Sequence, residues 1–492
     1  MRFKRETSRD SRRAIIDVGS NSVRLVIYDG PARIPYELHN EKVQARLGRG
    51  LSETGRIDPE AYNLALGACG RFKALLDASG ITAVRTVATA AAREATNGPD
   101  LLRDLDRLGL RPELLSGGAE GRASAAGVQS AFPGASGVVA DLGGGSLELA
   151  EIDGVHLGRS DSVPLGVLRL PALRRDGDRG FAAQVRTLLR GAGWRGAKSG
   201  LALFLVGGSW RALGHLDMHL TASAHPGVHG YVLVRDRLKA LRKAIAELGP
   251  RGLREVPGLT SSRIATLDDA AAVLAAVGEH LGSERMVISS FGLREGLLFE
   301  ALDETARRED PLLAATADYA GRQGDPRWHG DAIDDWIASV CPAGVAAEDR
   351  IRRAACHLAG IDLHPQSDTR ARHGMELAWL GAWIGITAQE RALLAATLWA
   401  AWSGRGECAQ VADFLTPEAR RLALIWGQSI RLAERLSGGV SDVLRHARLE
   451  RDETALTLTL VPKFADLGKG VALKQLGLLA QHLDLQVRLR AG

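Results

Sequence analysis

Residues 14–30 read AIIDVGSNSVRLVIYDG and residues 138–154 read VVADLGGGSLELAEIDG, so one pattern occurs twice at a constant offset of 124 residues. Each copy has a small or β-branched apolar run, a turn of Gly, Ser and Asn, and an alternating run that ends in Asp-Gly. This pattern is typical of a β-hairpin. Two copies predict two similar α/β lobes that face each other across a ligand cleft. The identical positions are Asp17/Asp141, Gly19/Gly143, Ser22/Ser146, Leu25/Leu149, Asp29/Asp153 and Gly30/Gly154.

The turns of the two hairpins are candidate phosphate-binding loops. Small residues leave consecutive backbone N–H groups unobstructed, and such a concavity binds an anion. Asp17 and Asp141 end the preceding strands, where a carboxylate can hold a magnesium ion or its waters beside the phosphate. A D-x-G turn is also a common hairpin feature, but its repetition favours binding. The candidates are Asp17, Gly19, Ser20, Asn21 and Ser22 in the first copy, and Gly143, Gly144, Gly145 and Ser146 in the second.

A third glycine cluster follows the strand-like run at 201–206. Gly207, Gly208 and Ser209 lead from this run into a predicted helix, whose N-terminus can bind an anion. The alternative is an ordinary strand-to-helix turn. Both interpretations stay open on the residues alone.

The chain changes character near residue 305, because seven of its nine tryptophans lie at or after Trp328. Strand signals fade beyond this point and helical periodicity replaces them. We therefore expect a basic tail at 1–13, lobes at 14–136 and 137–305, an α-helical domain at 306–440 and a small α/β appendix at 441–492.

Hydrophobic periodicity places the predicted elements more closely. Helices are expected at 59–78, 120–131, 348–359, 372–385, 388–402 and 471–483. Strands are expected at 453–461 and 486–490, on either side of the last helix.

Composition excludes several classes of protein. The 63 basic and 58 acidic residues give a net charge of only +5, which is too balanced for a nucleic-acid coat. The longest apolar runs, such as 377–386, are shorter than the roughly 18–20 residues of a membrane span. Four dispersed cysteines without a C-x-x-C pair indicate neither a metal knuckle nor a disulfide framework. We expect a cytoplasmic protein with no membrane or nucleic-acid partner.

The motifs DVGSNS, ADLGGGS and the later GGS together resemble the phosphate-binding loops of the actin, sugar-kinase and heat-shock ATPase superfamily. Four further segments resemble the exopolyphosphatase/guanosine pentaphosphate phosphohydrolase family. They are RLGRGL (46–51), ATAAAREATN (88–97), LSGGAEGRASAAGV (115–128) and SSFGLREGLL (289–298). The resemblance implies two actin-like, ribonuclease H-like lobes, a helical domain similar to His-Asp phosphohydrolases, and a homodimer.

The resemblance also implies residue roles. Glu120 is at the position of the glutamate that activates water, while Ala119 replaces a neighbouring family glutamate. Asp141, with Glu148, is expected to hold magnesium, and a potassium ion is possible. Arg93 is at the position of a phosphate-clamping arginine.

Several activities remain open. The first is an exopolyphosphatase that uses magnesium to remove terminal phosphate processively from inorganic polyphosphate. The alternatives are a guanosine pentaphosphate 5′-phosphohydrolase and a protein that binds polyphosphate or guanosine penta- and tetraphosphate without turnover. A fourth is a phosphotransferase or ATP-driven switch. Trp210 argues against the fourth, because its indole is expected to crowd the adenosine space of nucleotide-binding relatives.

The helical domain resembles a degraded His-Asp site. Leu358 follows His357 where the parent motif has an aspartate, and His373 has only Glu376 nearby, so both histidines are expected to be structural. Trp379 and Trp383 are expected to anchor the core from one helix face. Five arginines form either a solvated face or a groove for a polyanion. They are Arg350, Arg352, Arg353, Arg370 and Arg372.

Overall fold

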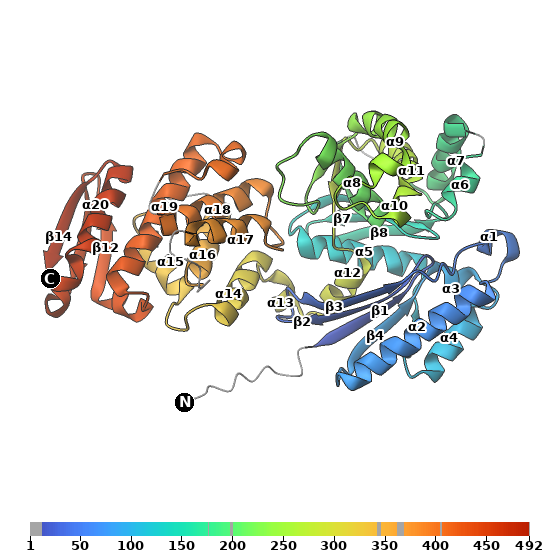
Figure 1. Cartoon of the computed structure of the whole chain (residues 1–492), viewed down its shortest axis with the longest axis horizontal. Helices are drawn as coiled ribbons and strands as arrows, with labels where there is room; N and C mark the ends of the chain where they lie inside the picture. The colour runs from blue at the N-terminus through green and yellow to red at the C-terminus, as the bar shows by residue number, and fades with distance from the viewer. Residues whose placement is uncertain are drawn as a thin grey trace. The chain divides into compact units, whose positions relative to one another are not determined.

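The computed structural model describes residues 12–175, 177–196, 200–341, 346–361, 369–403 and 406–491. The chain folds into two compact units that separate between Arg308 and Glu309 (Figure 1). Most of the predicted tail, residues 1–11, lies outside the described residues. Its last residue, Arg13, already belongs to the first strand.

The N-terminal unit contains two mixed β-sheets. The first has the strand order β3-β2-β1-β4-β5, in which β1 is antiparallel to β2 and parallel to β4. The strands are β1 (Arg13–Val18), β2 (Val23–Asp29), β3 (Tyr36–Val43), β4 (Ala83–Ala88) and β5 (Glu113–Leu114). Apolar side chains of β1 and β2 pack against helices α2 (Pro59–Ala78) and α4 (Gly98–Arg107), which lie side by side in Figure 1.

The second sheet has the order β10-β11-β9-β6-β7-β8. Its strands are β6 (Ser136–Leu142), β7 (Leu147–Asp153), β8 (His156–Val163), β9 (Ala202–Val206), β10 (Val232–Val234) and β11 (Arg285–Ile288). Its core is closed by α7 (Gly177–Gly191), α8 (Gly208–Leu220), α9 (Arg237–Leu253) and α11 (Leu267–Leu281). The pairs β1/β2 and β6/β7 are both antiparallel, so the two predicted hairpins are confirmed.

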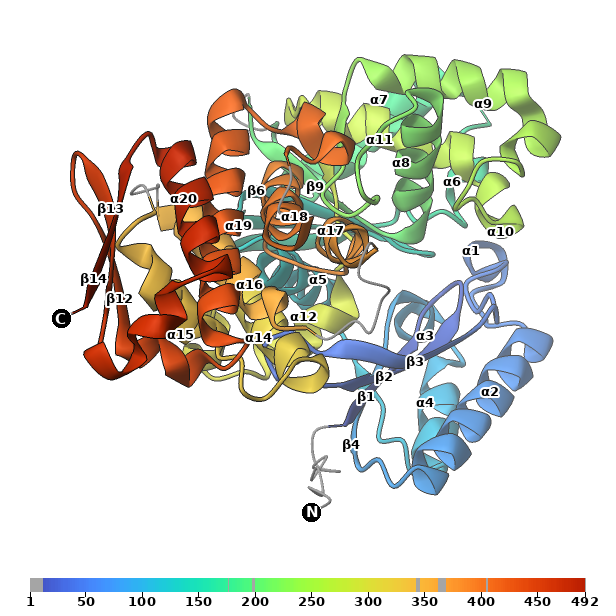
Figure 2. The same cartoon turned by 60° about the vertical axis from the view of Figure 1, so that its left-hand side comes forward.

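Helices α5 (Gly117–Ala131) and α12 (Leu293–Glu300) pack closely on each other, and Figures 1 and 2 show both between the sheets. Through Ala123, α5 contributes to an apolar cluster with the first sheet, and through Val128 to one with the second. Glycines allow this close approach, because a Cβ on Gly296 would lie 1.7 Å from the carbonyl oxygen of Ala123. Five short helices complete the unit: α1 (Leu51–Thr54), α3 (Ala90–Glu94), α6 (Leu170–Leu173), α10 (Ser261–Ile264) and α13 (Glu304–Arg308).

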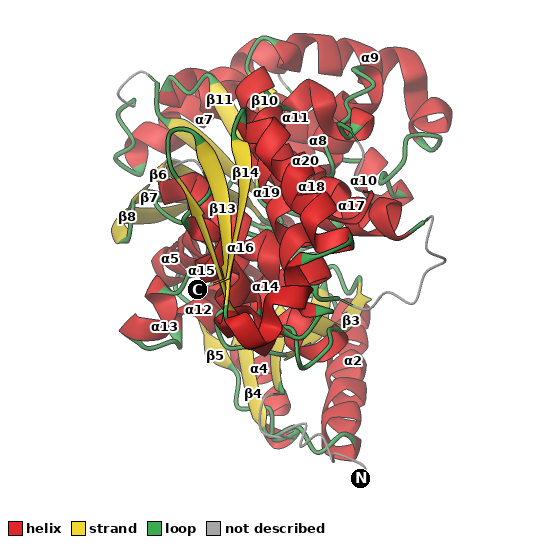
Figure 3. Ribbon diagram, turned by 90° about the vertical axis from the view of Figure 1, so that its left-hand side faces the viewer, coloured by secondary structure: helices red, strands yellow, loops and turns green. Residues whose placement is uncertain are grey.

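The C-terminal unit is helical with a small terminal sheet, as predicted. Its α-helices are α14 (Pro311–Gln323), α15 (Gly330–Ala338), α16 (Ala346–Ala359), α17 (Arg370–Leu380), α18 (Ala388–Ser403), α19 (Pro417–Ser437) and α20 (Val471–Leu483). Its sheet has the order β12-β13-β14, with β12 (Ala447–Arg451), β13 (Ala455–Leu460) and β14 (Gln486–Ala491); Figure 2 labels all three strands, and Figure 3 shows β13 beside β14. Within the described residues, no helix is long and apolar enough to cross a membrane.

The predicted helix at 372–385 is too long, because α17 ends at Leu380, where Gly381 takes an extended conformation. Trp379 and Trp383 are both buried in the core, but only Trp379 is on this helix. The two tryptophans therefore do not share one helix face, and Trp383 instead packs edge-on against Tyr319.

Candidate active site

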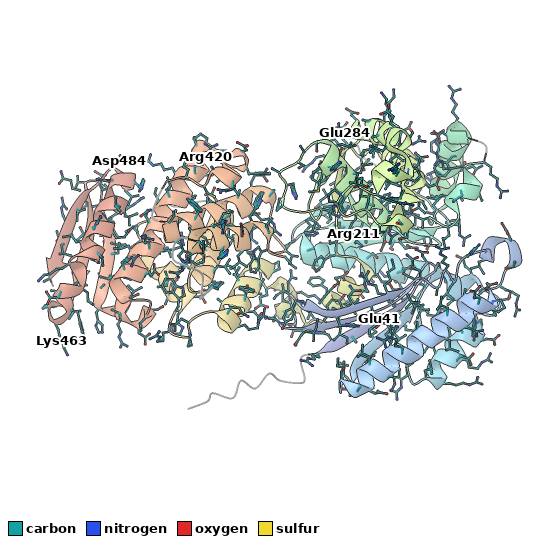
Figure 4. The ribbon with its side chains drawn as sticks, viewed as in Figure 1. Glu41, Arg211, Glu284, Arg420, Lys463 and Asp484 are labelled. Carbon is teal, nitrogen blue, oxygen red and sulfur yellow. The ribbon has the colours of Figure 1, made fainter. Side chains whose placement is uncertain are left out.

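A cavity of about 980 Å³ opens between the two sheets of the N-terminal unit. Both hairpin turns and the third glycine cluster reach it. Figure 4 shows Arg211, another of its wall residues, between the two sheets. Of the predicted phosphate-binding residues, those that line the cavity are Asp17, Gly19, Ser20, Asn21, Ser22, Gly143, Gly144, Gly145, Ser146, Gly207 and Gly208.

The two hairpin turns are closed in the same way. The amide of Gly19 donates to the Ser22 carbonyl at 3.1 Å, and the amide of Gly143 donates to the Ser146 carbonyl at 3.0 Å. The turns also touch each other, because a Cβ on Gly144 would lie 2.8 Å from the amide nitrogen of Asn21. The duplicated sequence thus brings two loops of small residues face to face.

Acidic side chains gather at one end of the cavity. Asp141 and Glu148 are register partners across β6/β7, so both side chains project from the same face of the sheet. The hydroxyl of Ser124 donates to Asp141 Oδ2 at 2.5 Å, and that of Ser162 donates to Glu148 Oε1 at 2.8 Å. Burial raises the pKa of Asp141, and burial together with the Asp141 charge raises the pKa of Glu148.

Glu120 lies in the first turn of α5, and its carboxylate joins this acidic end. Ser116 caps the helix by accepting from the Ala119 amide at 3.2 Å. Gly121 lets the helix approach the second sheet, since a Cβ there would lie 2.4 Å from Ser160 Oγ. Glu120 is 8% exposed, and burial followed by the charge of Glu148 raises its pKa. A raised pKa is typical of a carboxylate that exchanges protons near neutral pH.

Arg93 is next to Glu120, with its Nη1 3.5 Å from Glu120 Oε2. The same nitrogen donates to the Leu115 carbonyl at 2.7 Å, which orients the guanidinium. Ala119, where the family has another glutamate, packs against an apolar cluster that contains Leu115 and Ala123.

The acidic end has the donor chemistry that magnesium needs. Asp17, Asp141 and Glu148 supply carboxylate oxygens, and the charge of Asp141 raises the pKa of Glu148 while that of Asp17 raises the pKa of Asp141. Across the described residues, no group of three or more His, Cys, Asp and Glu side chains could hold a metal ion. Magnesium commonly uses one or two carboxylates and takes its other ligands from water and substrate phosphates. Asp141 and Glu148 fit that mode of binding.

Cationic side chains that the sequence analysis did not single out line the same cavity. They are Arg24, Lys42, Arg211, Arg263 and Arg294. Burial and the charge of Arg263 lower the pKa of Lys42 to about 8. Burial and the charge of Arg294 lower the pKa of Arg24 and Arg211. Such mutual repulsion favours an anion among these residues.

Two of these cations carried a signal in the sequence. Arg24 is at the position in the first hairpin that Glu148 has in the second, and Arg294 is in the segment SSFGLREGLL. Lys42 on β3, Arg211 on α8 and Arg263 on α10 come from separate elements, so no spacing in the sequence links them.

The third glycine cluster reaches the cavity only in part. Gly207 and Gly208 line it, whereas Ser209 is fully buried and its hydroxyl accepts from Arg263 Nη1 at 3.2 Å. The expectation that Trp210 crowds this space is wrong. Its indole is fully buried in the core and donates to the Ala270 carbonyl at 3.1 Å, because the first turn of α8 directs it away from the cavity.

A second cavity, of about 1330 Å³, adjoins the first and shares Asn21, Val167 and Arg263 with it. Arg46 and Arg49, from the loop after β3, also line it. No carboxylate lines it among the residues that the structure describes. Polar groups of Gln44, Ser261, Ser262 and Thr266 complete its wall.

Four of the five arginines considered for a polyanion groove in the helical unit form ion pairs. Their partners are carboxylates of neighbouring elements, and for Arg352 also Asp349 of its own helix. The pairs are Arg350 with Asp310 and Glu390, Arg352 with Asp334 and Asp349, Arg353 with Asp334, and Arg370 with Glu434. Arg372 is exposed.

The buried His357 has a polar neighbour at each ring nitrogen. Its Nδ1 is 2.9 Å from Thr316 Oγ1 and its Nε2 is 3.0 Å from Asp331 Oδ1. His373 is exposed on α17.

Comparisons with known proteins agree with this geometry. The model of the Ppx/GppA phosphatase family matches residues 26–305, and that of the exopolyphosphatase C-terminal region matches residues 327–487. Exopolyphosphatase 1 of Mycobacterium leprae is 27% identical over 332 residues, which cover 64% of this chain and 96% of that protein. Retrograde regulation protein 2 of Saccharomyces cerevisiae is 24% identical over 445 residues, covering 79% of this chain and 72% of that protein.

The fold comparison gives the same result. The crystal structure of the Aquifex aeolicus Ppx/GppA family member matches with a TM-score of 0.51 at 25% identity. The match covers 59% of this chain and 96% of that one.

Proposed function

The chain belongs to the Ppx/GppA phosphatase family, and from this premise we propose that it removes terminal orthophosphate from inorganic polyphosphate, processively and with magnesium. One observation carries the proposal: five cations line the same cavity as the phosphate loops, and no aromatic side chain lines it within the described residues. Polyphosphate offers charge at every unit and no base to stack.

Acidic and cationic side chains share the cavity, and Arg294 and Arg211 lower the pKa of Asp17 and of Asp141, respectively. The charges that act on Glu120 come chiefly from Glu148, Arg93 and Asp141. The strongest charges that act on Lys42 are those of Arg263 and Arg24, and the charge of Lys42 in turn lowers the pKa of Asp17. Because Glu120 has mainly acidic neighbours and Lys42 mainly cationic ones, the terminal phosphate would lie beside Glu120 and the following phosphates beside Lys42.

Hydrolysis at the acidic end requires little covalent help from the protein. The carboxylate of Glu120 accepts a proton from a water whose oxygen bonds to the terminal phosphorus, while the bond to the bridging oxygen breaks. That oxygen and its negative charge stay on the shortened chain, beside the cations. Backbone amides of the two loops hold the non-bridging oxygens. Magnesium held by Asp141 and Glu148 would neutralise charge that develops on the phosphate.

The alternative substrate is guanosine pentaphosphate. The second cavity favours it, because the amides of Asn21 and Gln44 and the apolar side chains of Val167 and Leu168 offer a purine both hydrogen bonds and apolar contact. The same catalytic residues would then cleave the 5′-terminal phosphate.

Orthophosphate release by the purified full chain with magnesium tests the proposal. Long-chain polyphosphate, guanosine pentaphosphate and ATP are compared at equal concentrations of cleavable ends. We expect the fastest release from polyphosphate. Faster release from guanosine pentaphosphate would assign the alternative, and no release from any substrate would overturn hydrolysis as the function.

A further inference from the structure

A third cavity, of about 710 Å³, lies behind the phosphate loops. Its walls include residues of α1 and α6, two short helices that are neighbours in Figures 1 and 2. It shares two residues with the catalytic cavity, Ser20 and Gly145, which are the tips of the two hairpin turns. Ser20 and Gly145 are thus the partition between the two spaces.

This partition is thin and carries no large side chain. A Cβ on Gly145 would lie 2.8 Å from Ser20 Oγ, so the two loop tips are in contact and Gly145 contributes backbone alone. The Ser20 carbonyl accepts from the Gly48 amide at 2.8 Å, which ties the first loop to the wall of the third cavity.

The third cavity adjoins the end of the site where water attacks. Helix α3 connects the two regions: Ala90 lines the catalytic cavity, Ala91 lines the third cavity, and Arg93 contacts Glu120. The proposed base Glu120 must lie beside the terminal phosphate, and its contact with Arg93 therefore places that phosphate near α3 and the third cavity.

We propose that the third cavity is the exit for orthophosphate, the product of the proposed hydrolysis. The inference rests on the proposed function, because only an enzyme that keeps its shortened chain in place needs a second opening. A retained polyphosphate occupies the catalytic cavity beside its cations and blocks that route for the product. Separation of the loop tips Ser20 and Gly145 lets the phosphate pass behind them while the chain advances.

The charges of the third cavity suit an exit better than a storage site. Arg169 is neutralised by an ion pair with Glu94, and this pair also joins α3 to the segment before α6. Arg175 makes no ion pair within the described residues, and Glu53 lines the same cavity. One unpaired guanidinium beside one carboxylate attracts a phosphate only weakly, so the product is not retained.

The test narrows the third cavity without touching the catalytic one. Ala172 is exposed on α6 and lines the third cavity, so Ala172→Phe fills part of it. Ala74→Phe, at an exposed position of α2, is the matched control. We expect Ala172→Phe to slow steady-state orthophosphate release from long polyphosphate about 10-fold, and to leave single-turnover cleavage within about twofold, because only product release is obstructed.

Chain-length analysis provides a readout that a purely structural defect would not move. With the exit narrowed, the shortened chain must dissociate before orthophosphate can leave, so Ala172→Phe should produce chains of intermediate length that the unmodified protein and Ala74→Phe do not. Equal steady-state rates and chain-length patterns in the three proteins would overturn the exit, as would an equal loss of single-turnover and steady-state rates. If the unmodified protein releases no orthophosphate from polyphosphate, the proposed function itself is wrong.

Discussion

Asp141 lies directly opposite Glu148 across the β6/β7 hairpin. At the equivalent step of the first hairpin, Asp17 is instead paired with Arg24. The duplicated element therefore presents two acids from one copy and an acid with a base from the other. Two acids on one face suit a metal ion, whereas a guanidinium suits the phosphates that the metal does not reach. One ancestral pattern thus supplies both kinds of ligand to the cavity.

Replacement of Glu120 by glutamine should remove the base and keep the shape of the site. We expect kcat for orthophosphate release to fall on the order of 10²–10⁴-fold, with polyphosphate binding retained. Binding is measured by isothermal titration calorimetry with polyphosphate. Glu255→Gln, at an exposed carboxylate, is the control and should change neither quantity. Normal turnover in Glu120→Gln would show that another group activates the water.

The hydroxyl of Ser162 orients Glu148 and should therefore affect magnesium binding. Ser162→Ala should raise the magnesium concentration for half-maximal activity about 10-fold, because an outer partner of a ligand is lost. Ser160→Ala is the matched control on the same strand, since the Ser160 hydroxyl donates to the Gly118 carbonyl at 3.0 Å. A similar shift in both variants would argue against Glu148 as a magnesium ligand.

The cations of the catalytic cavity should determine how the affinity for polyphosphate depends on salt. Arg211→Met should weaken polyphosphate binding about 10-fold and reduce the slope of log K against log salt by about 1, because one phosphate contact is lost. Arg372→Met changes an exposed arginine of the helical unit and should leave both values as they are. Fluorescence anisotropy with labelled polyphosphate at several salt concentrations provides the measurement. If Arg372→Met changed both values and Arg211→Met changed neither, the helical unit would be identified as the polyphosphate-binding surface.

The contact between α5 and α12 should be sensitive to a single methyl group. In Gly296→Ala, the new Cβ would collide with the Ala123 carbonyl, so we expect a loss of about 1–3 kcal/mol of stability together with reduced kcat, since α5 carries Glu120. Gly67→Ala, in α2, is the control. No atom lies within 4 Å of its Cβ position, and a helical Gly to Ala change should stabilise by about 0.5–1 kcal/mol. Thermal unfolding measures the stability of both variants. Equal melting temperatures for Gly296→Ala and Gly67→Ala would contradict the packing argument.

Stability without metal should depend on pH through Glu120. Its pKa is raised in the folded state, so the folded protein holds a proton that the unfolded chain releases. This contribution is fully present below the ordinary glutamate pKa of roughly 4.3 and is lost as pH rises through the raised value. With EDTA, Tm should therefore fall from acidic to mildly alkaline pH, and fall less in Glu120→Gln than in Glu255→Gln. Parallel curves for the two variants would exclude Glu120 as the source.

Local sequence patterns were sufficient to predict many of the helices and strands of this protein. The offset of 124 residues identified both hairpins, and apolar periodicity placed α2 at Pro59–Ala78 and α20 at Val471–Leu483. These features depend on neighbours in the chain, whose preferences act wherever the segment lies. The helix predicted at 372–385 was wrong at its C-terminal end. Gly381 stops α17, although the apolar run continues in the sequence.

Local sequence patterns could not predict where a side chain points or which distant residue it pairs with. The sequence shows that Trp210 follows a glycine turn, but only the fold decides that its indole enters the core. Likewise, the density of arginines around Arg352 suggested a free basic face, and the fold places Asp334 against that guanidinium at 2.7 Å. A charge becomes available or neutralised through partners that are distant in sequence.

The sequence by itself determined the duplicated hairpins, the small residues of their turns and the family to which the chain belongs, because each depends on residues close together in the chain. The tertiary structure decided which charges share the cavity: it brings Lys42, Arg211 and Arg263 together from three separate elements and buries Glu120 beside Glu148. Electrostatic free energy depends on distance in space and on burial, and neither can be read from position along the chain.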